Sequence, residues 1–163
     1  MNLQPEPERM AIHQAGHAVI QARVGGKRFK VKRLSLGVES NPAWPHKEAC
    51  GEATLDRETL LSIYEFGLVT LAGIAAEERY LADRPPEKEP LVALSDIAEW
   101  QEQARQVFSD EAQIELVSLN LFHKLREWFV DPGTWQVVEE LAAALLREGE
   151  LDEAFIQPLL ERL

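Results

Sequence analysis

Apolar residues recur at helical spacing along most of the chain. The pattern predicts five helices and a short sixth, over residues 6–24, 57–82, 91–108, 111–130, 134–147 and from 152 onward. Residues 29–36 alternate between apolar and polar instead, and residues 51–55 are predicted as a second short strand, so we expect a small antiparallel sheet. This order of elements predicts an α+β domain that is mostly α-helical, with its strands at one end.

Several residues mark how the predicted helices begin, end and pack. Asp56 and Thr134 suit helix N-termini, because their side-chain oxygens can accept hydrogen bonds from free backbone N–H groups, and Gly149 suits a helix end. Gly67 and Gly73 lie inside the helix predicted over 57–82, where glycine costs about 1 kcal/mol relative to alanine. We therefore expect another helix to pack tightly against this segment.

Two histidines stand out in the first predicted helix. His13 and His17 are four residues apart, on an apolar stripe that also holds Ile20. In a helix both imidazoles project from one face, one turn apart, and can bind a single metal ion. One histidine on such a stripe is more often a core residue with a hydrogen-bond partner. Two would each need a buried partner, whereas one metal ion satisfies both.

The residue between the histidines changes the chemistry that this spacing predicts. H-E-x-x-H is the motif of zinc peptidases, in which the glutamate takes a proton from the attacking water and delivers it to the leaving amine. Gln14 stands at the glutamate position. An amide neither takes up nor releases a proton near neutral pH. The sequence thus combines the ligand pair of a hydrolase with the loss of its general base.

The composition of the chain disfavours some classes of binding partner and indicates the type of cellular compartment. The chain has 17 basic and 28 acidic side chains and a formal charge of -11, which disfavours nucleic acid and anionic membrane surfaces as partners. Cys50 is the one cysteine, so no internal disulfide can form, as expected in a reducing compartment. Residues 1–9 are polar, and no apolar run approaches the roughly 18 residues of a membrane span. We expect one cytoplasmic domain over residues 1–163.

Three segments resemble the peptidase domain of the FtsH-type zinc metallopeptidases. Residues 13–18, HQAGHA, are similar to the family's H-E-A-G-H-A, and residues 71–78, LAGIAAEE, are similar to its L-x-G-x-A-A-E-E helix. Residues 95–97, SDI, lie where the family has its third zinc ligand, an aspartate. The likeness covers most of the chain in order and weakens after residue 108.

The resemblance implies a zincin-like helix, a small sheet, a helical bundle and a zinc site. By that likeness His13, His17 and Asp96 would bind Zn²⁺, with water or a substrate carbonyl in the fourth position. The predicted strand would hold an extended peptide through Gly51, Glu52, Ala53 and Thr54. In the family this domain follows a membrane anchor and an AAA+ ATPase. The 163 residues are too few for a peptidase domain and an ATPase module together. We therefore expect that a separate ATPase would carry out any unfolding of a protein substrate.

Other acidic residues and histidines have simpler explanations. Asp96 could be a first-turn acid favoured by the helix dipole. Glu77 and Glu78 could form an exposed helix end, although a glutamate on a neighbouring helix is also a known kind of third zinc ligand. His46 and His123 are predicted at the surface, although a loop beside a cleft could bring His46 near substrate.

Two functions follow from these observations, together with a third in which no metal takes part. The first is a metallopeptidase that is nearly inactive because of Gln14. The alternative is a non-catalytic pseudo-peptidase that keeps the fold, with or without the metal, and binds peptides or a protein partner. The third is a metal-free helical domain in which both histidines have other buried partners.

Overall fold

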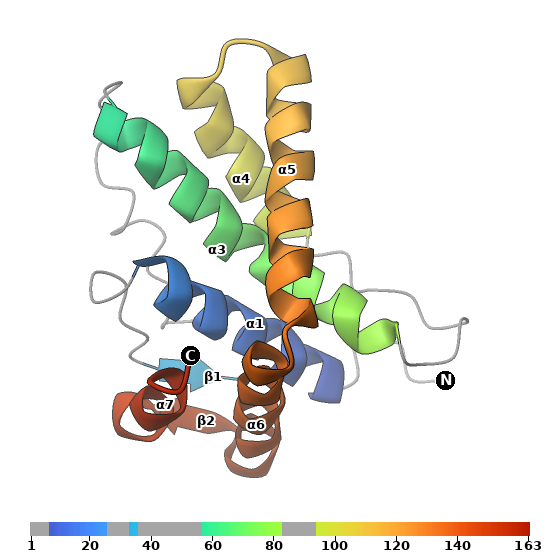
Figure 1. The fold of residues 1–163 in the computed structure, drawn as a ribbon, viewed down its shortest axis with the longest axis vertical. Helices are drawn as coiled ribbons and strands as arrows, with labels where there is room; N and C mark the ends of the chain where they lie inside the picture. The colour runs from blue at the N-terminus through green and yellow to red at the C-terminus, as the bar shows by residue number, and fades with distance from the viewer. Residues whose placement is uncertain (1–6, 26–32, 36–56, 83–93) are drawn as a thin grey trace.

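Helices dominate the architecture. The computed structural model describes residues 7–25, 33–35, 57–82 and 94–163. The elements in chain order are α1 (Pro7–Gly25), β1 (Arg33–Ser35), α3 (Arg57–Leu81), α4 (Leu94–Val107), α5 (Glu111–Val130), α6 (Pro132–Glu148), β2 (Glu150–Asp152) and α7 (Glu153–Leu160) (Figure 1). The predicted helical class and the approximate helix positions are confirmed. Within these ranges, no helix has both the length and the apolar character that crossing a membrane requires.

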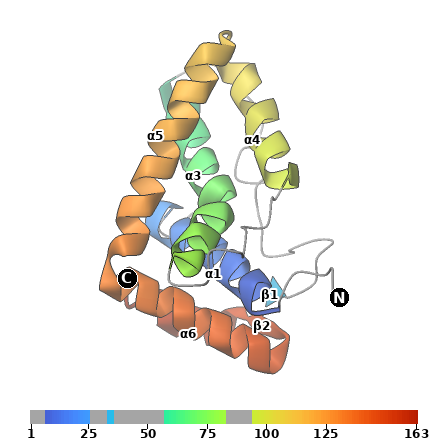
Figure 2. The same ribbon diagram turned by 90° about the vertical axis from the view of Figure 1, so that its right-hand side faces the viewer.

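Helix α1 lies in the middle of the molecule. It contacts α3 and α6, which cover it from different sides, while α4 and α5 pack against α3 (Figures 1 and 2). Residues 11–21 are buried without interruption. The single apolar stripe predicted for this helix therefore underestimates its burial, because two other helices enclose it. Apolar side chains such as Ile12 and Ile20 each contribute roughly 1.5–3 kcal/mol when fully buried.

Glycines allow the helices to approach closely. A Cβ added to Gly16 on α1 would lie 2.5 Å from the Cβ of Ala76 and 3.0 Å from the carbonyl oxygen of Ala72, both on α3. A Cβ added to Gly67 would lie 2.5 Å from Leu121 Cδ1 on α5. The tight packing expected around Gly67 is thus confirmed.

The small sheet joins distant parts of the chain. Strand β1 pairs antiparallel with β2, in a register that sets Leu34 opposite Leu151, and both leucines are buried. The strand predicted over 29–36 is therefore present in part, as residues 33–35. Its described partner comes from residues 150–152, whereas the predicted partner, residues 51–55, lies outside the described residues. A three-residue strand such as β2 is too short to show an alternating pattern.

The helix ends agree with the sequence in part. Gly149 ends α6 in the left-handed conformation with φ of 76°, as predicted. The prediction that Thr134 caps this helix is wrong. Asp131 is the capping residue, and it accepts hydrogen bonds from the backbone N–H and the hydroxyl of Thr134, both at 2.9 Å. The helix begins earlier than expected because Pro132 occupies its first turn, where a missing N–H has no cost. Asp56 lies outside the described residues.

Candidate metal centre

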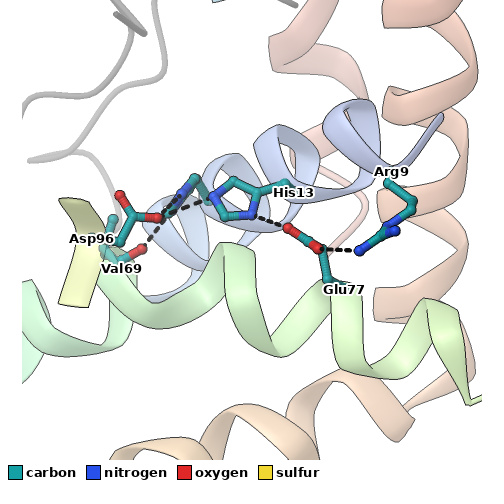
Figure 3. A network of polar contacts seen from close by, with 6 residues as sticks. Arg9, His13, Val69, Glu77 and Asp96 are labelled. Carbon is teal, nitrogen blue, oxygen red and sulfur yellow. Dashed lines mark hydrogen bonds and ion pairs between the residues drawn. The ribbon is translucent and has the colours of Figure 1, made fainter. Parts of the chain in front are cut away.

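The three predicted ligands come together where α1 meets the first turn of α4. One potential ligand atom from each of His13, His17 and Asp96 lies within 4.8 Å of the other two. Nε2 of His13 is 3.0 Å from Oδ2 of Asp96, and Nε2 of His17 is 3.3 Å from the same oxygen (Figure 3). Donor atoms of a tetrahedral zinc site lie roughly 3.3 Å apart, given metal–ligand bonds of about 2.0–2.1 Å. The two nitrogen–oxygen separations fit that geometry, whereas the widest separation among the three atoms, up to 4.8 Å, would have to shorten for one ion to bind all three.

Helix α3 fixes the other nitrogen of each imidazole. Nδ1 of His13 is 2.6 Å from Oε1 of Glu77, and Nδ1 of His17 donates to the backbone carbonyl of Val69 at 2.8 Å. With a proton on each Nδ1, each Nε2 can present its lone pair on the side of Asp96. Metal-binding histidines commonly have a carboxylate or a carbonyl on the second nitrogen, which sets the tautomer and the ring orientation. The Nδ1 atoms of both rings are therefore held as they are in metal-binding histidines.

Gly73 makes room for the imidazole of His13 on α3. A Cβ at this position would lie 2.6 Å from Cδ2 and from Cε1 of the ring. Glycine is unfavourable in the middle of a helix by about 1 kcal/mol relative to alanine. The tight packing expected around Gly73 is present, but a histidine ring, rather than helix backbone, occupies the space. The glycine therefore belongs to the site.

Trp100 anchors the helix that carries Asp96. Its side chain is 2% exposed and lies one helical turn beyond Asp96 on α4. Its ring packs against Gly67 of α3, and its Nε1–H donates to Ser118 Oγ of α5 at 2.7 Å. These contacts fix α4 against two other helices, and with it the carboxylate of Asp96. Sequence reasoning placed Trp100 in this helix without assigning it to the site.

Strong electrostatic coupling holds the metal-free site together. Burial by itself lowers the pKa of His13, but hydrogen bonds with Asp96 and Glu77 and the charges of both carboxylates raise it to about 9. Burial by itself raises the pKa of Asp96, yet hydrogen bonds and charges from His13 and His17 hold it well below its usual range. Without a metal, His13 is therefore an imidazolium at neutral pH. A metal has to displace its proton.

These contacts weaken one argument for a metal. The sequence suggested that two buried histidines would lack partners unless one metal satisfied both. In the structure each ring nitrogen already has a protein oxygen nearby. The case for a metal therefore depends on the arrangement: both Nε2 atoms converge on one carboxylate oxygen while α3 holds both Nδ1 atoms.

Glu77 is neither at an exposed helix end nor among the three converging ligands, the two positions predicted for it. It is fully buried, so it does not belong to an exposed helix end, and it lies on the Nδ1 side of His13, away from the converging Nε2 atoms. Glu78 is partly exposed and forms an ion pair with Arg126 of α5 at 3.0 Å. The two adjacent glutamates therefore differ in role. Glu77 supports a potential ligand, and Glu78 joins two helices at the surface.

The remaining predicted positions divide into described and undescribed residues. Gln14, at the position of the general base, lies beside His13 on α1 and is 9% exposed. His123 is exposed, as predicted, and pairs with Glu127 at 3.1 Å. The potential peptide-binding residues 51–54, together with His46 and Cys50, lie outside the described residues.

Arg9 joins the site without having been predicted there. Its Nη2 lies 3.6 Å from Oε2 of Glu77, and the exposures of the two side chains are 11% and 0% (Figure 3). Arg9 precedes His13 by four residues, so α1 brings both to the side that faces Glu77. That i, i+4 spacing was visible in the sequence, but its significance depends on the burial of Glu77.

Comparison with known proteins adds no relative. No model of a protein family matches the chain, and no curated protein does either. The functional argument therefore rests on the residues and their geometry.

Proposed function

We propose that this chain is a zinc-binding domain of the metallopeptidase type. A zincin-like helix, α1, supplies His13 and His17, and α4 supplies Asp96. The observation that carries the proposal is the convergence of two Nε2 atoms on one oxygen of Asp96 while their Nδ1 atoms are held from α3. Two imidazoles and one carboxylate suit zinc among the common divalent ions and leave a fourth position for a ligand. Zinc in such a site polarises a carbonyl and makes a water molecule more acidic.

The contacts around the site also support kinship with the FtsH-type peptidases. The HQAGHA segment carries both histidines, and the SDI segment carries Asp96. In the LAGIAAEE segment, Gly73 accommodates the His13 ring and Glu77 binds its Nδ1. All three segments that resemble the family thus contribute to one site. Their agreement is more specific than the histidine spacing alone.

Gln14 decides between catalysis and binding. Loss of a general base typically reduces the rate by about 10²–10⁴-fold, because no side chain takes the proton from the attacking water. We propose that the chain as it stands is at most a very slow peptidase. The retained histidine pair, Asp96 and Glu77 favour a second candidate, a pseudo-peptidase that uses the metal centre to bind a peptide or an unfolded protein segment.

Metal content tests the proposed site. The full chain would be dialysed against zinc and then against metal-free buffer, and the zinc retained would be measured by mass spectrometry. We expect about one zinc per chain, from one three-ligand site, and its loss in His13→Ala and Asp96→Ala. His123→Ala, at an exposed position of α5, is the control and should keep the metal. A wild-type chain that folds and retains no zinc would refute the proposal.

A reversion tests the role of Gln14. Gln14→Glu restores a carboxylate between the histidines and should raise the hydrolysis of unfolded casein by about 10²–10⁴-fold, the usual contribution of a general base. Gln14→Asp is the matched control, because its carboxylate is one methylene shorter. A zinc-loaded Gln14→Glu protein without increased hydrolysis would leave the pseudo-peptidase as the function, and binding of casein to the wild-type protein would then be measured.

A further inference from the structure

A chain of three side chains leads away from the candidate metal centre. Nδ1 of His13 contacts Oε1 of Glu77, and the other oxygen of Glu77 faces Arg9 (Figure 3). Arg9 and His13 lie one turn apart on α1, whereas Glu77 reaches them from α3. Glu77 is completely buried and Arg9 almost completely so. Arg9 belongs to none of the segments that resemble the peptidase family.

A buried carboxylate needs its partners in order to keep its charge and its orientation. Removing the cation of a buried ion pair leaves an uncompensated charge, which is strongly unfavourable. Glu77 has a flexible side chain, and the guanidinium at Oε2 restricts the positions that its carboxylate can occupy. While Arg9 holds Oε2, Oε1 remains directed at Nδ1 of His13.

We propose that Arg9 is a positioning residue of the metal centre, which acts through Glu77 to keep Nε2 of His13 directed at the metal. This inference rests on the proposed zinc site. Outer residues that orient a metal-binding histidine typically contribute about 10–100-fold to metal affinity. Arg9 is one step further from the metal than Glu77, so its effect lies near the lower end of that range.

The sign of the effect distinguishes positioning from a direct effect of charge. A guanidinium near a metal site repels the cation, so loss of Arg9 would tighten zinc binding if charge alone mattered. Loss of positioning has the opposite effect, because Glu77 no longer fixes His13. A merely structural contribution would change the unfolding temperature and leave the zinc affinity of the folded protein unchanged.

The test measures zinc affinity by competition with a chromophoric chelator, on the full chain. Arg9→Met should weaken zinc binding about tenfold, and Arg9→Lys should recover most of it. Arg9→Gln is a second neutral variant should Arg9→Met fail to fold. Arg126→Met is the matched control, because it removes the exposed partner of the neighbouring Glu78 and should leave the zinc affinity unchanged. Cobalt-loaded Arg9→Met should also show a shifted visible absorption band.

A double-mutant comparison asks whether Arg9 acts through Glu77. Glu77→Gln should weaken zinc binding, and adding Arg9→Met to it should cause no further loss, because the intermediary is already altered. Unchanged or tighter binding by Arg9→Met, or an equal loss in both backgrounds, would overturn the inference and leave the zinc site standing. Failure of the wild-type chain to bind zinc would overturn both proposals.

Discussion

Replacing Gly73 by alanine tests whether the packing of α3 against His13 builds the site. An alanine Cβ would lie 2.6 Å from Cδ2 and Cε1 of the imidazole, whereas ordinary contacts begin near 3.4 Å. Nε2 of the ring would lie closer still, so the ring must move by roughly 1 Å, or α1 and α3 must separate by a similar distance. Metal sites hold their ligand distances to within about 0.2 Å, so either response disturbs the centre.

Replacing glycine by alanine is expected to change the free energy of unfolding in opposite directions in an ordinary helix interior and at Gly73. Glycine to alanine in a helix interior normally stabilises a protein by about 1 kcal/mol. Overpacking a filled interior costs about 1–3 kcal/mol, so the net effect of Gly73→Ala should lie between no change and a loss of about 2 kcal/mol. Displacement of His13 from Glu77 and Asp96 should also weaken zinc binding by about tenfold or more.

Gly133→Ala provides a matched control on another helix. Gly133 is exposed in the first turn of α6, and an added Cβ would meet only Oδ2 of Asp131, at the ordinary distance of 3.4 Å. We expect neutral or slightly increased stability and unchanged zinc affinity. Urea unfolding of the metal-free proteins and chelator competition of the zinc-loaded ones would measure both quantities. If Gly73→Ala is stabilised like Gly133→Ala and binds zinc with wild-type affinity, the reasoning about this contact is wrong.

Two further predictions concern protonation and the support of Asp96. The pKa of His13 is raised to about 9 in the folded metal-free protein from an ordinary value of 6.5. The stability that its imidazolium provides is therefore complete below about pH 6.5 and is lost as the pH rises through 9. Because zinc competes with this proton, its affinity should rise over the same window, and binding at pH 7.5 should release about one proton, measurable by calorimetry in buffers of different ionisation enthalpy. A pH-independent zinc affinity between pH 6.5 and 9 would contradict this assignment. Trp100→Ala should cost about 3–5 kcal/mol in urea unfolding and weaken zinc binding through Asp96, whereas Ser118→Ala, which removes the oxygen that accepts from Trp100, should cost about 1 kcal/mol. Equal losses of stability from the two substitutions would show that Trp100 does not anchor α4 by packing.

Local features of the site could be predicted because they depend on neighbours along the chain. The i, i+4 spacing of His13 and His17 places them on one helical face whatever surrounds the helix. Helix periodicity likewise located most helices to within a few residues. The resemblance of three short segments then suggested Asp96 as the third ligand, although no local pattern distinguishes it from a first-turn acid.

Contacts between distant segments could not be predicted in this way. Glu77 precedes Glu78 in an apparently uniform helix end, yet packing buries one beside His13 and leaves the other partly exposed beside Arg126. The proposed role of Arg9 follows from that burial. The pairing of β1 with β2 joins residues more than a hundred positions apart. Neither strand is long enough for its sequence to indicate which segment it pairs with.

The sequence by itself determined the chemistry available to the chain, since an amide at Gln14 cannot act as a general base in any fold. It also determined the histidine pair, through the regular geometry of a helix. Only the tertiary structure decided what these residues meet. The packing of α3 and α4 against α1 sets Asp96 on the Nε2 side of the histidines and Glu77 and Val69 on the Nδ1 side. Such positions depend on contacts summed over the whole core, which no short segment encodes.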